Sequence, residues 1–535
     1  MHRPVASRGD RDPSLAAANL RVMRPRLVVL LLPTLLAGAS LVAGQSLKDF
    51  EKKVTEFTLA NGLHFIVVER HQAPVASFHT YVNVGSVDDP GGQTGLAHMF
   101  EHMAFKGTPA IGTKNWPEEK KALDAVDAAY KRFDAEKSKG RLADPEKLKK
   151  LAAGVEEAID KAESYVESNE YDRVVESNGG LDMNAGTGED STDYYYSFPA
   201  NRAELWFLLE SSRFLQPVFR EFYKERDVVR EERRMRVESS PQGKLIESLA
   251  AVAFSASSYR NMPGGWASDI DNFRRPDAER FYHEYYVPAN ITIGIVGDVN
   301  PQEMKRMAEK YFGRLPARPL PVLKLTEEPV QEGARRVGVA SPAQPFLIVA
   351  YKRPDQYSKD DAVLDVLNEV LSGGRTSIMY KDMVRDKQIA LAAGAEATFP
   401  GGKYPGLFLF FAAPANGHTV EENEKELYRV IEQAKQEKPD EATLQRIKTK
   451  LRAELIRKLA SNSGLASELT TYFANFGDWR RLFTELEEYE KVTAEDVQRV
   501  ARTYLVADHS TVAYTFVPPE APHPNGESVP EGGQK

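Results

Sequence analysis

The alternation of apolar and polar positions predicts two pairs of antiparallel strands in the first half of the chain. The alternating segment 56–59 and the mostly apolar segment 63–68 flank an Asn-Gly dipeptide, which is a hairpin turn signal. Residues 75–84 alternate between apolar and polar side chains, as in a half-buried strand. Two later runs rich in Thr and Tyr, at 181–187 and 191–198, predict a further pair of strands.

A long charged section, residues 116–171, lies between these strands. Its apolar residues recur every three or four positions, as at Leu123, Val126 and Tyr130. Two helices are predicted, over 117–137 and 145–171, with a break at the Gly and Pro residues between them. We expect a helical hairpin inserted in the first domain. Its role is either that of a solvated spacer or that of a lid or partner surface, and the sequence leaves both open.

The same order of elements occurs twice along the chain. Further helices are predicted over 202–214, across 225–234 and over 301–312, with a strand within 285–298. A Pro-rich stretch, 315–329, predicts a linker. Beyond it a strand at 345–351 and a helix at 360–371 follow, and residues 504–514 resemble residues 286–295.

This repetition predicts an α+β fold of two similar α/β domains, each a mostly antiparallel sheet with packed helices. The first domain would span 45–314 and carry the inserted hairpin, and the second would span 330–517. The tail, 518–535, is rich in Pro, Gly and Glu and is predicted to be disordered.

The first 44 residues have the pattern of a secretory signal. Three arginines precede the apolar run 27–36, and small residues follow up to Gly44. We expect cleavage near Gly44 and a periplasmic or secreted location in a bacterium. An uncleaved anchor is the alternative, disfavoured because the run is short and contains Pro33. The chain has no cysteine, so neither a lipid-anchored amino terminus nor a disulfide can form.

Composition and charge exclude some classes of partner. The chain has 535 residues, of which 42% are hydrophobic and 28% charged, as expected for a globular protein of several domains. Residues 1–44 carry a net charge of +4, so −12 remains on the other residues of a chain whose total is −8. An acidic protein argues against nucleic acid as partner. No apolar run after residue 44 is long enough to cross a bilayer.

The candidate chemistry lies in the pentapeptide His98-Met99-Phe100-Glu101-His102. On a helix, positions i, i+3 and i+4 share one face, so both histidines and Glu101 would project together. Two imidazoles one turn apart suit a tetrahedral zinc ion, with a carboxylate beside them to act on the bound water. This His-x-x-Glu-His order is the inverzincin motif. The alternative is a pair of histidines on a helix flank that water or carbonyl groups satisfy.

The residues around the pentapeptide match a family. They read Val-Gly-Ser-Val-Asp-Asp-Pro at 84–90, Thr-Gly-Leu-Ala-His at 94–98 and Phe-Lys-Gly-Thr at 105–108. This sequence resembles the pitrilysin/insulinase family of zinc metallopeptidases, which includes the mitochondrial processing peptidase. The resemblance covers residues 50–517. It implies a zinc metalloendopeptidase that binds one Zn²⁺ per chain and hydrolyses unfolded peptides between two similar domains.

The resemblance also implies the other members of the site. His98 and His102 would bind the metal, and Glu101 would be the general base. Alignment on Glu-Arg-x-Val-Val at 225–229 makes Glu232 the third ligand and Glu225 a second carboxylate near it. Glu231 competes by one register step, although its side chain would point about 100° away on a helix.

Substrate peptides in this family add a strand beside a segment that corresponds to Asn184 and Ala185. In the second domain Arg385 matches a substrate-contacting arginine, but the tyrosine expected seven positions later is Ala392. We therefore expect a same-fold partner subunit that supplies the missing group, in a heterodimer. The alternative is that Tyr380 substitutes and the chain acts alone or as a homodimer.

The second domain is not expected to bind metal. Asp365, Asn368 and Glu369 stand there in place of the two histidines and the base, so one metal site per chain is predicted. A function of another class also stays open, namely a non-catalytic peptide-binding or assembly subunit of a peptidase complex.

Overall fold

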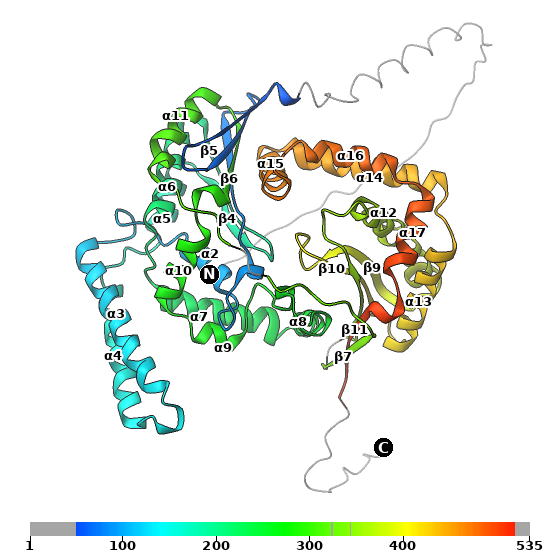
Figure 1. Ribbon diagram of the computed structural model, residues 1–535, viewed down its shortest axis with the longest axis horizontal. Helices are drawn as coiled ribbons and strands as arrows, with labels where there is room; N and C mark the ends of the chain where they lie inside the picture. The colour runs from blue at the N-terminus through cyan, green and yellow to red at the C-terminus, as the bar shows by residue number, and fades with distance from the viewer. Residues whose placement is uncertain (1–49, 323–324, 343, 519–535) are drawn as a thin grey trace, which may run out of the picture. The chain divides into compact units, whose positions relative to one another are not determined.

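The computed structural model describes residues 50–322, 325–342 and 344–518 (Figure 1). The predicted signal sequence and the predicted disordered tail from 519 onward lie outside the described residues. No helix in the described ranges combines the length and the apolar character needed to cross a membrane.

The first sheet has six strands in the order β1-β2-β6-β3-β5-β4. All neighbouring strands run antiparallel except β2 and β6, which are parallel. The strands are β1 (Val54–Thr58), β2 (His64–Glu69), β3 (Val75–Val82), β4 (Leu181–Thr187), β5 (Thr192–Pro199) and β6 (Ile291–Gly297). Strand β4 lies at an edge and pairs only with β5 among the described strands, so its other side is open.

The second sheet has five strands in the order β7-β11-β8-β10-β9. Its strands are β7 (Arg335–Ala340), β8 (Leu347–Arg353), β9 (Ala390–Phe399), β10 (Gly406–Pro414) and β11 (Ser510–Phe516). Helices α12 (Asp361–Ser372), α13 (Val420–Gln436) and α17 (Ala494–Tyr504) share its main core. The triplet β8-β10-β9 repeats the arrangement of β3-β5-β4, so the predicted α+β fold with two similar α/β domains is confirmed.

Each sheet is covered partly by a helix from the other half of the chain, which the sequence did not predict. Helix α15 (Asn462–Phe476) packs on β3 and β6 of the first sheet, opposite α6 (Ala203–Leu215) and α11 (Pro301–Tyr311). A Cβ atom on Gly294 would come within 2.8 Å of the Ala466 carbonyl oxygen, so the helix touches the strand backbone. In return α8 (Pro241–Ala253) packs on β7 and β11 of the second sheet.

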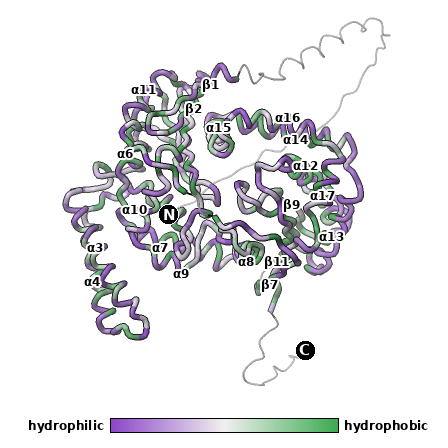
Figure 2. Tube along the Cα trace, in the orientation of Figure 1, coloured by the Kyte–Doolittle hydropathy of each residue, from purple (hydrophilic) through white to green (hydrophobic). Residues whose placement is uncertain are grey.

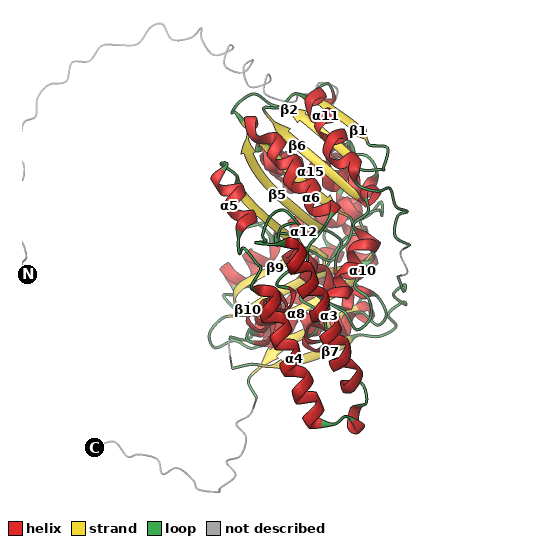
Figure 3. Ribbon diagram, turned by 90° about the vertical axis from the view of Figure 1, so that its left-hand side faces the viewer, coloured by secondary structure: helices red, strands yellow, loops and turns green. Residues whose placement is uncertain are grey.

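The inserted section forms the expected hairpin, in which α3 (Trp116–Lys137) and α4 (Pro145–Glu163) lie side by side (Figures 1 and 3). Both helices mix hydrophilic and hydrophobic positions (Figure 2). The predicted second helix, 145–171, is too long. It ends at Glu163, because Val166 bridges to Thr113 and Asn169 adopts a φ of 57°, which a helix cannot continue. A separate helix, α5 (Glu170–Ser177), follows.

A buried ion pair anchors this hairpin to the loop that follows α2 (Leu96–Met103). Arg220 Nε donates to Glu119 Oε1 at 2.7 Å, and both side chains are almost fully buried. The same guanidinium donates to the carbonyl oxygens of Thr108 and Ile111 at 2.9 and 2.8 Å. The pair thus joins α3 to the loop at 106–111.

Glu119→Ala should destabilise the protein by about 3–5 kcal/mol, because it leaves the buried Arg220 charge without its counter-ion. Urea unfolding followed by tryptophan fluorescence measures the change. Glu118→Ala is the matched control. Glu118 is half-exposed and pairs with Lys121 at 2.7 Å near the surface, so its loss should cost less than about 1 kcal/mol. Equal midpoints for the two variants would contradict the anchoring role of the buried pair.

Candidate metal centre

Helix α2 presents the pentapeptide in the way that its spacing predicts. The helix begins after Gly95, whose φ of 90° is left-handed, and Asp89 accepts from the N–H groups of Gly95 and Ala97 at 2.6 and 2.8 Å. The buried face consists of Leu96, Ala97, Met99, Phe100 and Met103. His98, Glu101 and His102 therefore lie on the opposite, half-buried face.

Helix α7 (Phe222–Arg233) brings a carboxylate to the two histidines. Glu232 Oε2 lies 3.7 Å from His98 Nε2 and 3.5 Å from His102 Nε2. Among the described residues these three form one group of potential ligand atoms that all lie within 4.8 Å of one another. Glu231 points elsewhere, since it is exposed and pairs with Arg234.

The donor set fits a zinc ion. Two imidazole nitrogens and one carboxylate oxygen are the ligands of a catalytic zinc site, which keeps a fourth position open. Burial lowers the pKa of His98 to about 4, so the ring is neutral near pH 7, which is the form that binds metal. Nδ1 of His98 is buried and has no hydrogen-bond partner among the described groups.

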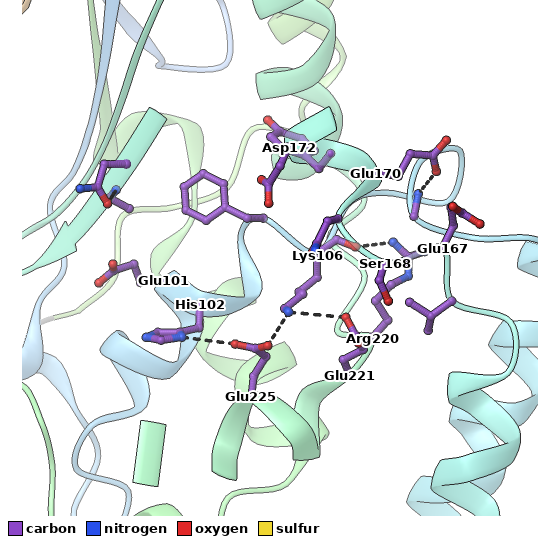
Figure 4. Close-up of a pocket in the computed structure, with 17 residues that line it drawn as sticks. Glu101, His102, Lys106, Glu167, Ser168, Glu170, Asp172, Arg220, Glu221 and Glu225 are labelled. Carbon is purple, nitrogen blue, oxygen red and sulfur yellow. Dashed lines mark hydrogen bonds and ion pairs between the residues drawn. The ribbon is translucent and has the colours of Figure 1, made fainter. Parts of the chain in front are cut away.

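Glu225 holds the ring of His102 from behind (Figure 4). Its Oε2 lies 3.4 Å from His102 Nδ1, which leaves Nε2 directed at Glu232. Burial lowers the pKa of His102, but the hydrogen bond to Glu225 and the nearby carboxylates outweigh it, so that pKa is raised. Burial raises the pKa of Glu225, but hydrogen bonds from His102 and Lys106 outweigh it and lower that pKa.

Glu101 has a partner that the sequence did not reveal. The hydroxyl of Thr187, the last residue of β4, donates to Glu101 Oε2 at 2.6 Å. Burial raises the pKa of Glu101, and the Thr187 hydrogen bond opposes this rise. Thr187 lay within a predicted strand, but no signal in the sequence shows that its hydroxyl reaches the helix.

The predicted peptide-binding edge adjoins these groups. Asn184 and Ala185 of β4 line a cavity of about 280 Å³ together with Glu101 and His102. Arg385 is not among the residues that line it. It lies in a π-helical segment, η8 (Tyr380–Asp386), and pairs with Asp386 at 2.6 Å.

The corresponding positions of the second half hold different contacts. Glu369 accepts from Lys450 at 2.7 and 2.9 Å, and Asp365 accepts from the Tyr489 hydroxyl at 2.8 Å. An ion pair and a hydrogen bond thus occupy the face that carries the histidines in the first half.

Comparisons with known proteins agree with this architecture. The family model described as insulinase (peptidase family M16) matches residues 65–135, and the model described as peptidase M16 inactive domain matches residues 272–451. The zinc protease PqqE of Helicobacter pylori is 28% identical over 492 residues, which cover 89% of this chain and 95% of that protein. A probable mitochondrial-processing peptidase subunit beta of Arabidopsis thaliana is 22% identical over 471 residues, which cover 85% of this chain and 76% of that protein.

Solved structures show the same fold. A protease from Helicobacter pylori superimposes with a TM-score of 0.72 at 26% identity, covering 87% of this chain and 99% of that one. The periplasmic protease PqqL from Escherichia coli gives a TM-score of 0.63 at 14% identity, covering 87% of this chain and 48% of that one. The chain thus carries domains of the peptidase M16 (insulinase/pitrilysin) family and shares the fold of these relatives.

Proposed function

We propose that this chain is a zinc metalloendopeptidase that hydrolyses unfolded peptides, with one Zn²⁺ held by His98, His102 and Glu232. The observation that carries the proposal is the convergence of these three side chains from α2 and α7, with Glu101 between them and an open strand edge. Relatives named zinc proteases support it. The relative solved as a periplasmic protease supports a periplasmic or secreted location.

Glu101 and Thr187 have different roles in the proposed hydrolysis. Zinc, when bound, lowers the pKa of a coordinated water to about 7 and polarises a carbonyl group. Glu101 takes the proton of the attacking water as general base and passes it to the leaving amine. The Thr187 hydroxyl holds one oxygen of Glu101, so the other is free for this transfer.

The edge strand β4 selects extended peptides. Its unpaired main-chain groups can hydrogen-bond an added strand of any sequence, which a folded substrate cannot offer. Asn184 and Ala185 would hold that strand beside Glu101, because the same cavity touches all three.

Thr187→Val should lower kcat roughly tenfold with little change in KM. Without the hydroxyl, the carboxylate of Glu101 loses the hydrogen bond that holds it in position to take the proton. Thr187→Ser keeps the hydroxyl and should restore most of the rate. Steady-state hydrolysis of a quenched peptide by both variants tests this. Equal kcat values for Val and Ser would contradict a positioning role for the hydroxyl.

The direct test of the function is metal analysis of the purified protein together with peptide hydrolysis. We expect one zinc per chain, and hydrolysis that is lost on chelation and restored by zinc. Full hydrolysis by the metal-free chain would contradict the proposal. Zinc binding without any hydrolysis, alone or with a related chain, would favour a non-catalytic peptide-binding or assembly subunit.

Two observations favour a partner subunit. The inactive-domain model matches residues 272–451, which include much of the second domain, and Ala392, which is exposed on β9, cannot donate the hydrogen bond that a tyrosine would. Donors to a developing oxyanion contribute several kcal/mol. We therefore expect slow hydrolysis by the zinc-loaded chain alone and at least roughly tenfold faster hydrolysis with a same-fold partner.

The rival arrangement uses Tyr380, which is half-buried in η8, in a single chain or a homodimer. Tyr380→Phe separates the two. Fast hydrolysis by the chain alone that Tyr380→Phe removes would overturn the heterodimer.

A further inference from the structure

The cavity beside the metal centre is lined on one side by residues that follow the inserted hairpin, among them Glu167, Ser168 and Glu170 (Figure 4). Its inner end is formed by Glu101, His102 and the edge strand β4. Its outer wall is the segment 166–172, which comprises the end of the link from α4 to α5 and the first residues of α5. A side chain of a peptide bound along β4 can therefore enter this cavity next to the bond that is cleaved.

The two cations that line the cavity are already engaged. Lys106 forms ion pairs with Glu225 and, at 3.5 Å, with Glu221. Arg220 is buried and forms an ion pair with Glu119. Both cations are therefore already paired with carboxylates other than Asp172.

The six lining carboxylates differ in how they are satisfied. Glu221 and Glu225 pair with Lys106, Glu101 accepts from Thr187, Glu170 accepts from the Gly112 N–H, and Glu167 pairs with Arg173. Asp172 has no hydrogen bond or ion pair to any residue that the structure describes. Figure 4 places it across the cavity from Glu225. Burial and the charge of Glu176 raise the pKa of Asp172, and the charge of Lys106 opposes this rise. A further cation beside Asp172 would stabilise its ionised form.

Apolar side chains complete the wall around this carboxylate. Phe105, Val166 and Tyr171 line the cavity together with Asp172. Such walls suit the methylene stem of a lysine or arginine, whose charged end then reaches the carboxylate. An aromatic ring also attracts a guanidinium or ammonium group placed over its face.

We propose that this cavity binds a lysine or arginine side chain of the substrate beside the cleaved bond, and that Asp172 selects it. The inference rests on the proposed peptidase function. It also assigns a role to the insertion, whose foot builds the wall of the selective cavity.

The test uses peptides that are identical except for Arg, norleucine or Glu at one position, scanned along both sides of the cleaved bond. At one position we expect wild-type kcat/KM for the Arg peptide to exceed that for the norleucine peptide at least tenfold. Asp172→Asn should reduce this ratio to near one, and Asp172→Lys should favour the Glu peptide. Glu176→Gln is the control, since it removes a charge from the same helix at an exposed position that does not line the cavity.

A binding measurement separates this inference from the proposed function. In a Glu101→Gln background, fluorescence anisotropy with the same peptides reports selection without hydrolysis. Arg selection that Asp172→Asn removes would support the cavity even if the wild type hydrolyses nothing. Hydrolysis without Arg selection, or selection that Asp172→Asn leaves intact and Glu176→Gln removes, would overturn the role of Asp172.

Discussion

Replacing Glu101 by Gln should abolish peptide hydrolysis while the protein keeps its zinc. The amide cannot take a proton from water, and general bases contribute roughly 10²–10⁴-fold to rates. Its oxygen can still accept from Thr187, which donates to Glu101 at 2.6 Å, so the side chain should stay in place. The measurements are kcat on a quenched peptide and zinc content of the same preparation.

Two results would contradict this mechanism. Turnover near that of the wild type would show that another group takes the proton. Loss of zinc in Glu101→Gln would show that Glu101 helps to bind the metal, which its position facing Thr187 does not suggest.

Glu232→Gln and His102→Ala should each lose zinc as well as activity. Oε2 of Glu232 lies within 3.7 Å of both imidazoles, so its loss removes a donor from the group of three. Mutation of residues that only hydrogen-bond a zinc ligand lowers metal affinity roughly 10–100-fold. Loss of a ligand itself should therefore lower the zinc affinity by more than this factor. Zinc titration of the metal-free variants, followed by peptide hydrolysis, measures both effects.

Glu231→Gln is the matched control, one position away on the same helix. Glu231 is exposed and bonded to Arg234, so this variant should keep both zinc and turnover. If Glu231→Gln lost zinc and Glu232→Gln retained it, the ligand set would be wrong by one register step.

Helical periodicity alone determined the face that carries the candidate chemistry. His98, Glu101 and His102 project together because positions three and four apart meet on any α-helix, and α2 buries the apolar residues between them. The predicted strands and most helix bounds likewise follow from local alternation and turn residues. The helix predicted over 145–171 was wrong because a distant contact, between Thr113 and Val166, ends it early.

Packing decided the rest of the site. Glu232 reaches the histidines because α7 lies against α2, and the direction of its side chain depends on that register. Thr187 meets Glu101 only because β4 ends beside the helix, and Asp172 joins the same cavity because the first turn of α5 lines it. The packing of α15 on the first sheet and of α8 on the second sheet is likewise a contact between distant parts of the chain. Such contacts join residues far apart in sequence, and no short-range pattern encodes the distance between two elements that only a shared core brings together.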